Sequence, residues 1–397
     1  MMTCFRAGSR GLRVAMMVGL ASSAVLLGCS DDAPSGDPSP PSGDAAPFSL
    51  PRLEPGTHVS MIRGFNPPDA DLDPLLDAFW QDARDAGMRS GRIQIDWADL
   101  ETAPGVYDEA RLVEALERAD LRDLQILAGV YALDTEGPVL PDDLQAAVLG
   151  GTRLDDPEVA ERWEDFLRWL LPVLDRYDVW GLLITNEPDS WIVDEGDRPA
   201  EEVAAFYAQA NRIADAVTPE IVVGATHTSF VRTNPERFHT DTLREIDFAS
   251  YNYYPLDPLL FSVGSDADAV RDALDRYLEV SDGKPVVIQE LGASAGWPDR
   301  PSDMGATVEQ QLTFYRTSLD VAQRNDQLRA VYAFQLVDWS AETYGIFRDI
   351  LAAEGTPPDF LDRNDEYLGT LGLIDITGTP RPAWPVFLDA VRATASP

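Results

Sequence analysis

Two glutamates each end a short apolar run in the sequence. VWGLLIT runs up to Asn186 and Glu187, and PVVI runs up to Gln289 and Glu290. Apolar runs of this length are typical of strands that are buried on both faces. A carboxylate at the mouth of such a strand gives up hydration, and nothing in the local sequence explains that cost by packing. Glu187 and Glu290 are therefore candidates for chemistry.

Two carboxyl groups that face one cavity suit the cleavage of a glycosidic bond. One carboxylic acid protonates the leaving oxygen, while the other carboxylate attacks the anomeric carbon. Each glutamate alone has a simpler explanation, since Glu187 could be a solvated strand end and Glu290 could cap the following turn. The two together, at the ends of two strands, favour a catalytic pair.

Strand-like and helical stretches alternate along the chain from about residue 58. The expected strands cover residues 59–65, 91–97, 124–131, 179–185, 221–226, 246–254, 285–290 and 330–337. Stretches such as PLLDAFWQDARDAG and VEQQLTFYRTSLDVAQRN have helical spacing of apolar residues between them. This alternation predicts an α/β fold, a closed (β/α)₈ TIM barrel. The active site of such a barrel lies at the C-terminal ends of the strands, where both glutamates fall.

An open doubly wound sheet is the alternative arrangement of these elements. Its dinucleotide-binding form needs a GxGxxG loop after the first strand, and the sequence RGFNPP at residues 63–68 lacks that spacing. The chain has three histidines and no HExxH sequence. We therefore expect neither a cofactor nor a metal.

The charge of the chain limits its partners. There are 68 acidic and 31 basic residues among 397, which gives a formal net charge of −37. Binding to phosphates relies on clustered Lys and Arg, so this balance argues against a nucleic-acid partner and disfavours acidic substrates. A neutral substrate is expected.

The N-terminus has the pattern of an export signal. Arg6, Arg10 and Arg13 precede VAMMVGLASSAVLLG, which is short for a membrane span but suits a signal-peptide core. The sequence LLGC that ends at Cys29 resembles the lipobox of bacterial lipoproteins, which implies cleavage before Cys29 and acylation of its thiol. Ser30 implies the outer membrane in that family. A plain secretory signal that happens to contain Cys29 is the alternative.

The segment after Cys29 has the composition of a tether. It reads SDDAPSGDPSPPSGDAAP and is rich in Pro, Ser, Gly and Asp. We therefore expect a lipoprotein signal peptide at 1–28, a disordered tether at 29–50 and one folded domain at 51–397. Cys4, the only other cysteine, would leave with the signal, so no disulfide is expected in the exported chain.

The folded part resembles glycoside hydrolase clan A, the retaining glycosidases built on a (β/α)₈ barrel. The sequence Asn-Glu-Pro that begins at Asn186 is similar to the clan's signature after the fourth strand. This implies that Glu187 is the acid/base and that Asn186 binds the sugar 2-hydroxyl. Glu290 is similar to the clan's nucleophile, and Arg92 lies where many members have an arginine near it. Trp339, after the eighth strand, resembles the aromatic platform under the cleaved sugar.

The resemblance covers most of residues 58–392, with departures. Thr185 stands where many members have Trp before Asn-Glu-Pro, and Tyr131 where many have His. In the sixth strand, Asn252 and Tyr254 replace a His-x-Tyr pattern. Tyr254 can still donate a hydrogen bond to the nucleophile, whereas Asn252 is neutral. The two-carboxylate chemistry is kept, and the family and substrate are left open.

Other residues at strand ends have two explanations each. Trp97, Trp191 and Trp297 could stack on sugar rings or pack a loop, and His227 ends the fifth strand. Arg92 could be an ion-pair partner inside the barrel, and Tyr254 and Trp339 could be core aromatics.

The sequence is interpreted as an exported, lipid-anchored glycoside hydrolase that cleaves a neutral oligo- or polysaccharide with retention. Glu290 would attack the anomeric carbon, and Glu187 would act first as acid and then as base. Carbohydrate is the expected partner, the membrane is contacted only through the lipid, and a monomer is expected. A catalytically inactive glycan-binding lipoprotein and a transglycosylase remain as alternatives. Residues 132–156 and 340–380 are expected to shape substrate choice.

Overall fold

The structure is a computed structural model. It describes residues 59–62, 73–120, 123–135, 137–189, 191, 199–228, 242–353 and 355–395. The expected signal peptide, Cys29 and the expected tether lie outside these residues, so lipidation stays a prediction.

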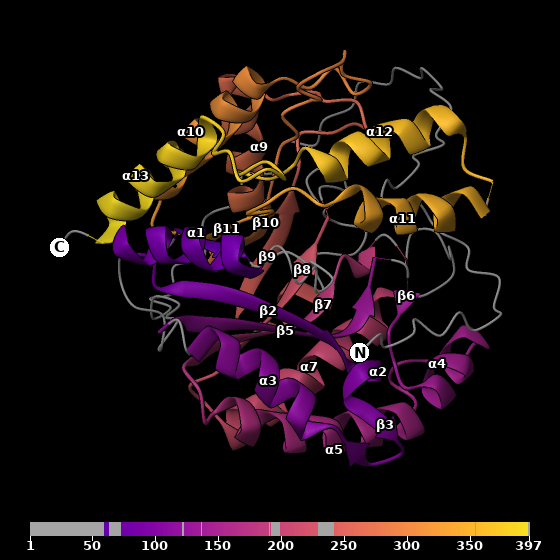
Figure 1. The fold of residues 1–397 in the computed structure, drawn as a ribbon. Helices are drawn as coiled ribbons and strands as arrows, with labels where there is room; N and C mark the ends of the chain where they lie inside the picture. Colours follow the sequence, from indigo (N-terminus) through magenta and orange to yellow (C-terminus); the bar gives the residue numbers. More distant parts are fainter. Residues whose placement is uncertain are drawn as a thin grey trace, which may run out of the picture.

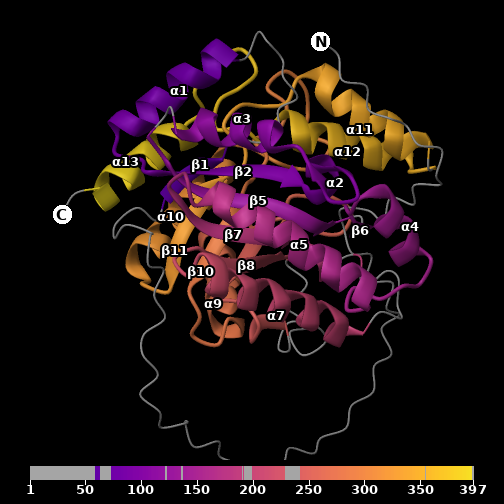
Figure 2. The same ribbon diagram turned by 90° about the horizontal axis from the view of Figure 1, so that it is seen from below.

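Eight parallel strands form a closed barrel at the centre of the molecule (Figures 1 and 2). In chain order they are β1 (Val59–Ile62), β2 (Ser90–Asp96), β5 (Gln125–Asp134), β7 (Val179–Asn186), β8 (Val222–His227), β9 (Phe248–Tyr253), β10 (Val286–Leu291) and β11 (Leu328–Ala333). Each strand pairs in parallel with the next one in this series, and β11 pairs with β1, so the sheet closes on itself. The predicted (β/α)₈ barrel is confirmed.

Helices enclose the strands on the outside of the barrel (Figure 2). They are α1 (Asp73–Asp85), α2 (Trp97–Leu100), α3 (Glu109–Asp120), α4 (Asp142–Leu149), α5 (Pro157–Leu174), α7 (Ala200–Val217), α9 (Ala267–Val280), α10 (Val308–Arg324), α11 (Ala341–Ala353), α12 (Pro358–Gly369) and α13 (Ala383–Ala395). The final helix α13 packs against α10 and β1, which joins the end of the barrel to its beginning. Most of the connection between β8 and β9 lies outside the described residues.

The strands are buried on both faces, as their apolar runs predict. Every residue of β7, β8, β9 and β10 is buried. Inside the barrel, Leu127, Trp180, Phe248 and Tyr332 belong to one packed cluster. Gly224 leaves room for the Phe248 ring, because a Cβ at this position would overlap that ring. The barrel interior is therefore a solid core that supports the strand ends.

The outer helices bury one face each, and capping side chains fix where some of them begin. The carboxylate of Asp266 accepts hydrogen bonds from the backbone N–H groups of Asp268 and Ala269 at the start of α9. The hydroxyl of Thr307 accepts a hydrogen bond from the Gln310 N–H at the start of α10. These bonds satisfy donors that have no partner inside a helix, so they set the helix N-termini.

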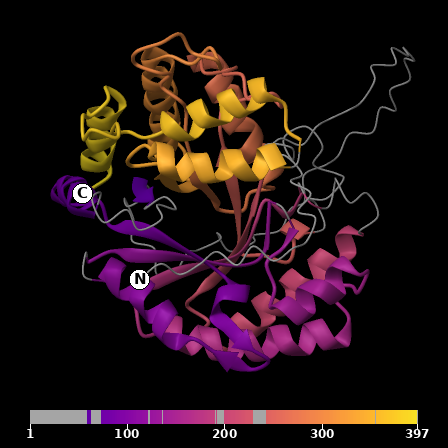
Figure 3. The same ribbon diagram turned by 45° about the vertical axis from the view of Figure 1, so that its right-hand side comes forward.

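Three additions interrupt the simple alternation of strands and helices. β3 (Glu101–Ala103) and β4 (Val106–Tyr107) form a short hairpin after α2. β5 continues to Asp134, past its expected end at residue 131, and turns back as the antiparallel strand β6 (Gly137–Pro138). After β11, α11 and α12 pack against each other and lie side by side in Figures 1 and 3. The last two additions fall in the long segments expected to shape substrate choice.

Candidate active site

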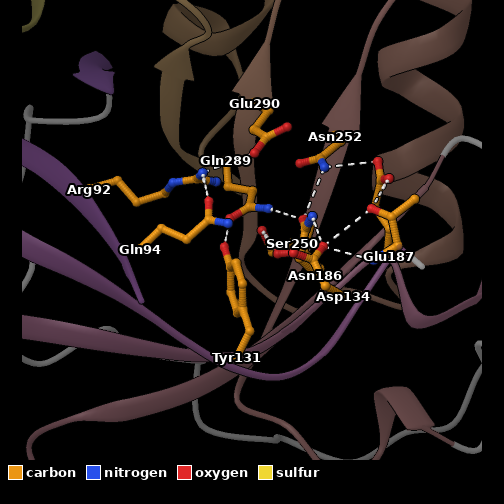
Figure 4. A network of polar contacts seen from close by, with 12 residues as sticks. Arg92, Gln94, Tyr131, Asp134, Asn186, Glu187, Ser250, Asn252, Gln289 and Glu290 are labelled. Carbon is orange, nitrogen blue, oxygen red and sulfur yellow. Dashed lines mark hydrogen bonds and ion pairs between the residues drawn. The ribbon is translucent and has the colours of Figure 1, made fainter. Parts of the chain in front are cut away.

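Glu187 and Glu290 lie at the same end of the barrel. Glu187 directly follows β7, and Glu290 is the next-to-last residue of β10. Asn252 of β9 connects the two: it is paired in register with Glu290, and its amide nitrogen donates a hydrogen bond of 2.8 Å to Glu187 Oε1. Figure 4 shows these three side chains together. The two carboxyl groups therefore belong to one polar network.

Glu290 accepts hydrogen bonds from an arginine on β2 and from a tyrosine that directly follows β9. Arg92 of β2 donates from Nη2 to Glu290 Oε1 over 2.9 Å, and Tyr254 donates its hydroxyl to Oε2 over 2.6 Å. Arg92 also donates to Gln94 Oε1 over 2.7 Å, which fixes the guanidinium (Figure 4). Burial, and next the charge of Glu290, raise the pKa of Tyr254 well above its ordinary value, so the hydroxyl remains a donor. Together the two contacts fix the position of both carboxyl oxygens of Glu290.

Glu187 is held in an unusual backbone conformation. Its φ of +51° is in the left-handed region, which is rare for a residue other than glycine, and its N–H donates to the Thr226 carbonyl over 2.9 Å. On the side chain, Oε2 lies 2.9 Å from the hydroxyl of Thr135. Burial, followed by the charge of Glu290, raises the pKa of Glu187 to about 8. Glu187 is therefore a carboxylic acid at neutral pH, as a general acid requires.

Asn186 is held by side chains of the third, sixth and seventh barrel strands. Its Oδ1 accepts hydrogen bonds from Gln289 Nε2 over 2.6 Å and from Asn252 over 3.1 Å. Its Nδ2 donates to Asp134 Oδ1 over 2.7 Å, and the Tyr131 hydroxyl fixes Gln289 in turn over 2.9 Å. The Asn186 amide is therefore oriented, and its second N–H remains for a ligand.

Two further carboxyl groups surround this network. Burial raises the pKa of Asp134, the last residue of β5. Burial, followed by the charge of Asp134, raises the pKa of Asp96 at the end of β2 to about 8. The site end of the barrel is thus rich in acids, and the charge of Arg92 is balanced by Glu290.

Trp339, the expected aromatic platform, lies in an apolar cluster that adjoins the site. It is buried and stacks on Phe347 with ring centroids 5.1 Å apart. The same cluster contacts Tyr254 and Phe334. Phe334, directly after β11, meets the Tyr254 ring edge to face at 6.1 Å. It is a half-buried aromatic next to a partner of Glu290 that the sequence interpretation did not select.

The other tryptophans have different surroundings. Trp97 begins α2 and is fully buried among Trp163 and Phe166, so it cannot stack on a sugar and the functional explanation for it is wrong. Trp191 is also buried, and its ring lies against Gly137 of β6. Trp297 is half-buried and is covered by the guanidinium of Arg300 at 4.6 Å. None of these contacts supports a role in binding sugar.

His227 ends β8 as expected and is completely buried beside Tyr251, with ring centroids 6.3 Å apart. Among the described residues, no group of three or more His, Cys, Asp or Glu side chains has the arrangement of a metal site. Within the same residues, no helix is both long enough and apolar enough to cross a membrane.

Asp134 and Thr135 are the site residues that the sequence interpretation missed. The expected strand ended at residue 131, and the turn signal in the following sequence ALDTEGP marks a hairpin rather than the start of a helix. Asp134 and Thr135 lie at that turn and contact Asn186 and Glu187. The turn could be recognised in the sequence, but the position of Asp134 and Thr135 beside the end of β7 depends on the register of the barrel strands.

No protein-family model matches the chain, and no curated protein matches it in sequence. Solved structures do match. The exo-β-1,4-mannosidase Op5Man5 from Opitutaceae bacterium strain TAV5 has 17% identity and a TM-score of 0.61, over 85% of this chain and 59% of that one. A GH5_18 protein from Streptomyces cattleya in complex with GlcNAc has 16% identity and a TM-score of 0.61, over 85% and 81%. A GH2 β-galacturonidase from Eisenbergiella tayi bound to galacturonate has 17% identity and a TM-score of 0.52, over 86% and 51%.

The chain has the fold of these glycoside hydrolases. The barrel implied by the resemblance to clan A is therefore confirmed. The chain spans less than two thirds of the mannosidase and of the galacturonidase. At such identities the likeness extends to the fold, and the activity has to be argued from the site residues.

Proposed function

We propose that the protein is a retaining glycoside hydrolase with Glu290 as nucleophile and Glu187 as acid/base. The observation that carries the proposal is the contrast between the two carboxyl groups. Glu290 is bonded by the cationic Arg92 and by Tyr254, whereas Glu187 has neutral partners and a pKa of about 8. A buried carboxyl group that keeps its proton suits the acid, and a carboxylate paired with a cation suits the nucleophile.

The proposed reaction has two steps. In the first, Glu187 gives its proton to the leaving oxygen while Glu290 attacks the anomeric carbon and forms a glycosyl ester. Ester formation removes the charge of Glu290, which is the second cause of the raised pKa of Glu187, so that pKa falls. Glu187 then takes a proton from water, which attacks the anomeric carbon and releases Glu290. The free N–H of Asn186 is proposed to bind the sugar 2-hydroxyl.

We propose a neutral oligo- or polysaccharide as the substrate. Asp134 interacts with Glu290 and Asp96 interacts with Asp134; burial and these like charges raise the pKa of both aspartates, so this surrounding already disfavours negative charge, and the positive charge of Arg92 is balanced by Glu290. A uronic acid would add another carboxylate to this surrounding, at a Coulombic cost. The chemistry of the site therefore favours the neutral sugars of the similar GH5_18 complexes over the galacturonate of the GH2 structure.

A hydrolysis screen of the purified protein over neutral and uronic glycans tests the activity. We expect hydrolysis of a neutral glycan, with a first product that keeps the anomeric configuration of the substrate in proton NMR before mutarotation. An inverted first product would contradict the assignment of Glu290 as nucleophile. Glycan binding without hydrolysis would favour the binding lipoprotein, and transfer to sugar with no transfer to water would favour the transglycosylase.

Azide rescue tests the two roles separately. Glu187→Ala and Glu290→Ala should each lose roughly two to four orders of magnitude in turnover, because acid catalysis alone is worth that much. With an activated aryl glycoside, whose leaving group needs no proton, Glu187→Ala should form a glycosyl azide of retained configuration. Glu290→Ala should form the inverted azide. A variant with near wild-type turnover on a natural substrate would remove its residue from the mechanism.

A further inference from the structure

We propose that Asp134 and Thr135, at the turn of the β5–β6 hairpin, are positioning residues that set the protonation state of Glu187. This inference rests on the proposed function, since it concerns the acid/base of the same site. The hairpin places both residues at the end of β7: Leu133 pairs in register with Thr185, and Asp134 pairs with Gly137 of β6. The extension of β5 beyond the barrel rim therefore brings a second carboxyl group to the acid/base.

The hydroxyl of Thr135 lies between two carboxyl groups. Its Oγ1 is 2.9 Å from Glu187 Oε2 and 3.2 Å from Asp134 Oδ1. A hydroxyl carries one hydrogen, so it can donate fully to only one of these oxygens. The remaining contact is favourable only when the other carboxyl group is protonated and donates to the hydroxyl.

Asp134 Oδ1 is already committed as an acceptor. It accepts from Asn186 Nδ2 and from the backbone N–H of Thr135, each over 2.7 Å (Figure 4). Burial raises the pKa of Asp134, and the hydrogen bonds from Asn186, from the Thr135 N–H and from the Thr135 hydroxyl oppose that rise. In the proposed arrangement these three donors keep Asp134 as the ionised partner. Glu187 then carries the proton and donates it to Thr135. This arrangement favours the acid form of Glu187, which the first step of the reaction needs.

The same hydroxyl serves the second step. When Glu187 gives its proton to the leaving oxygen, the hydrogen of Thr135 rotates from Asp134 to the new carboxylate of Glu187. It stays bonded to Thr135, so no proton reaches Asp134. Thr135 can thereby form a hydrogen bond with Glu187 in either protonation state. Asp134 favours the protonated form of Glu187.

Other groups also face Glu187. They are Glu290 of β10, Asp189 after β7, Asn252 of β9, Tyr254 and Tyr367 of α12. The charges of Glu290 and Asp189 raise the pKa of Glu187, whereas the hydrogen bonds that Asn252 and Thr135 donate to its carboxylate form lower it. The two tyrosines stay neutral because the pKa of each is raised well above its ordinary value. All of these groups are unchanged by substitutions in the hairpin, so such substitutions isolate its contribution.

Asp134→Asn tests the bias toward the acid. We expect the pKa of Glu187 to fall by about one unit, since the neutral amide no longer draws the hydrogen of Thr135 away from the Glu187 carboxylate. Carbon-13 NMR of labelled glutamate carboxyls, with Glu187→Gln for assignment, reads this pKa without any substrate. The alkaline limb of kcat/KM should move by the same amount, with about a tenfold loss of kcat/KM above it. Asp142→Asn, the same change of charge on exposed α4, is the matched control.

The hydroxyl is tested by a double-mutant cycle. Asp134→Asn should shift the pKa of Glu187 by less than half as much in a Thr135→Val background, whereas a Thr135→Ser background should preserve the shift. Circular dichroism and Tm identify variants that fail to fold, and Thr135→Ser then remains as the milder probe. An unchanged pKa in Asp134→Asn would overturn the proposal, and an equal shift in Thr135→Val would remove Thr135 from it. Hydrolysis by the wild-type protein tests the proposed function independently of these titrations.

Discussion

Glu187 links the chemistry of the site to the stability of the fold. An unfolded glutamate has a pKa of about 4.3, whereas burial and the charge of Glu290 raise the pKa of Glu187 to about 8 in the fold. For an acid whose folded-state pKa is raised, the stability present below the unfolded pKa is lost as pH rises through the folded pKa. The wild-type protein should therefore lose stability between about pH 4 and pH 8 through this residue.

Glu187→Gln removes this loss, because glutamine has the same shape and no titrating proton. We expect the variant to have a higher Tm than the wild type at pH 8, by roughly 5–10 °C, since 1 kcal/mol is worth about 2–4 °C in a domain of 150–250 residues and less in this larger one. The difference should vanish below about pH 4, where both side chains are neutral. Thermal unfolding across this pH range measures it. Glu161→Gln on the exposed face of α5 should show no such pH dependence, and a pH-independent gain in Glu187→Gln would contradict the linkage.

Single residues differ in how far the sequence could predict their surroundings. Glu187 and Glu290 stand out because each interrupts an apolar run, and a resemblance to a known clan places Arg92 and Tyr254 beside Glu290. The contacts of Asn252 with Glu187 and of Thr135 with Asp134 were not predictable, because they depend on strand register and side-chain rotamers. Of the two explanations left open for Trp97, packing holds, because β2 ends at Asp96 and the next side chain is buried among Trp163 and Phe166.

At the level of elements, the packing of the barrel core depends on side chains of complementary size on neighbouring strands. Gly224 of β8 lies under the Phe248 ring of β9, and a Cβ there would overlap the ring. We expect Gly224→Ala to destabilise the fold by about 1–3 kcal/mol, which is the usual cost of overpacking a core. Urea unfolding measures the change. Activity should fall with the folded fraction, because Thr226, which fixes the Glu187 backbone, is on the same strand.

Gly345 of α11 is the matched control for this prediction. It lies inside a helix, and nothing stands within 4 Å of a Cβ built there. Gly345→Ala should therefore leave the free energy of unfolding unchanged or raise it by up to about 1 kcal/mol, because alanine is the better helix former. If Gly224→Ala and Gly345→Ala lost the same free energy of unfolding, overlap with the Phe248 ring would not be the cause of the destabilisation in Gly224→Ala.

The elements themselves followed from hydrophobic patterns, with identifiable exceptions. Most barrel strands are largely apolar runs, although β2 reads SGRIQID, and the helices between them have apolar residues at helical spacing. Both kinds of element are therefore visible in the sequence. The continuation of β5 into β6 was not predicted. Residues 132–134 read as a loop because they follow a complete apolar run, and their strand conformation depends on pairing with Gly137 and Pro138. The sequence of residues 132–134 alone therefore does not show that they form a strand.

At the scale of the whole molecule, the acidic composition and the N-terminal segment suggest where the barrel works. A tether of the expected length at residues 29–50 would span roughly 25 Å as a flexible coil, and its prolines would extend it further. We propose that this segment holds the barrel away from the outer membrane, where its strand ends remain open to a long neutral glycan. The net charge of −37 would also keep the protein from anionic surfaces.

The proposed anchor is tested at Cys29. LLGC resembles a lipobox and the segment after it has no core-forming character, so we expect cleavage before Cys29 and acylation of its thiol and new amino group. Two or more acyl chains hold a protein stably on a membrane, whereas one chain binds reversibly. Cys29→Ala should therefore abolish labelling by radioactive palmitate and leave the protein either unprocessed or soluble. Cys4→Ala is the matched control, because that cysteine would leave with the signal and its loss should change neither result. Wild-type labelling and membrane fractionation in Cys29→Ala would exclude the anchor and favour a plain secretory signal, and the proposed chemistry of Glu187 and Glu290 would be unaffected.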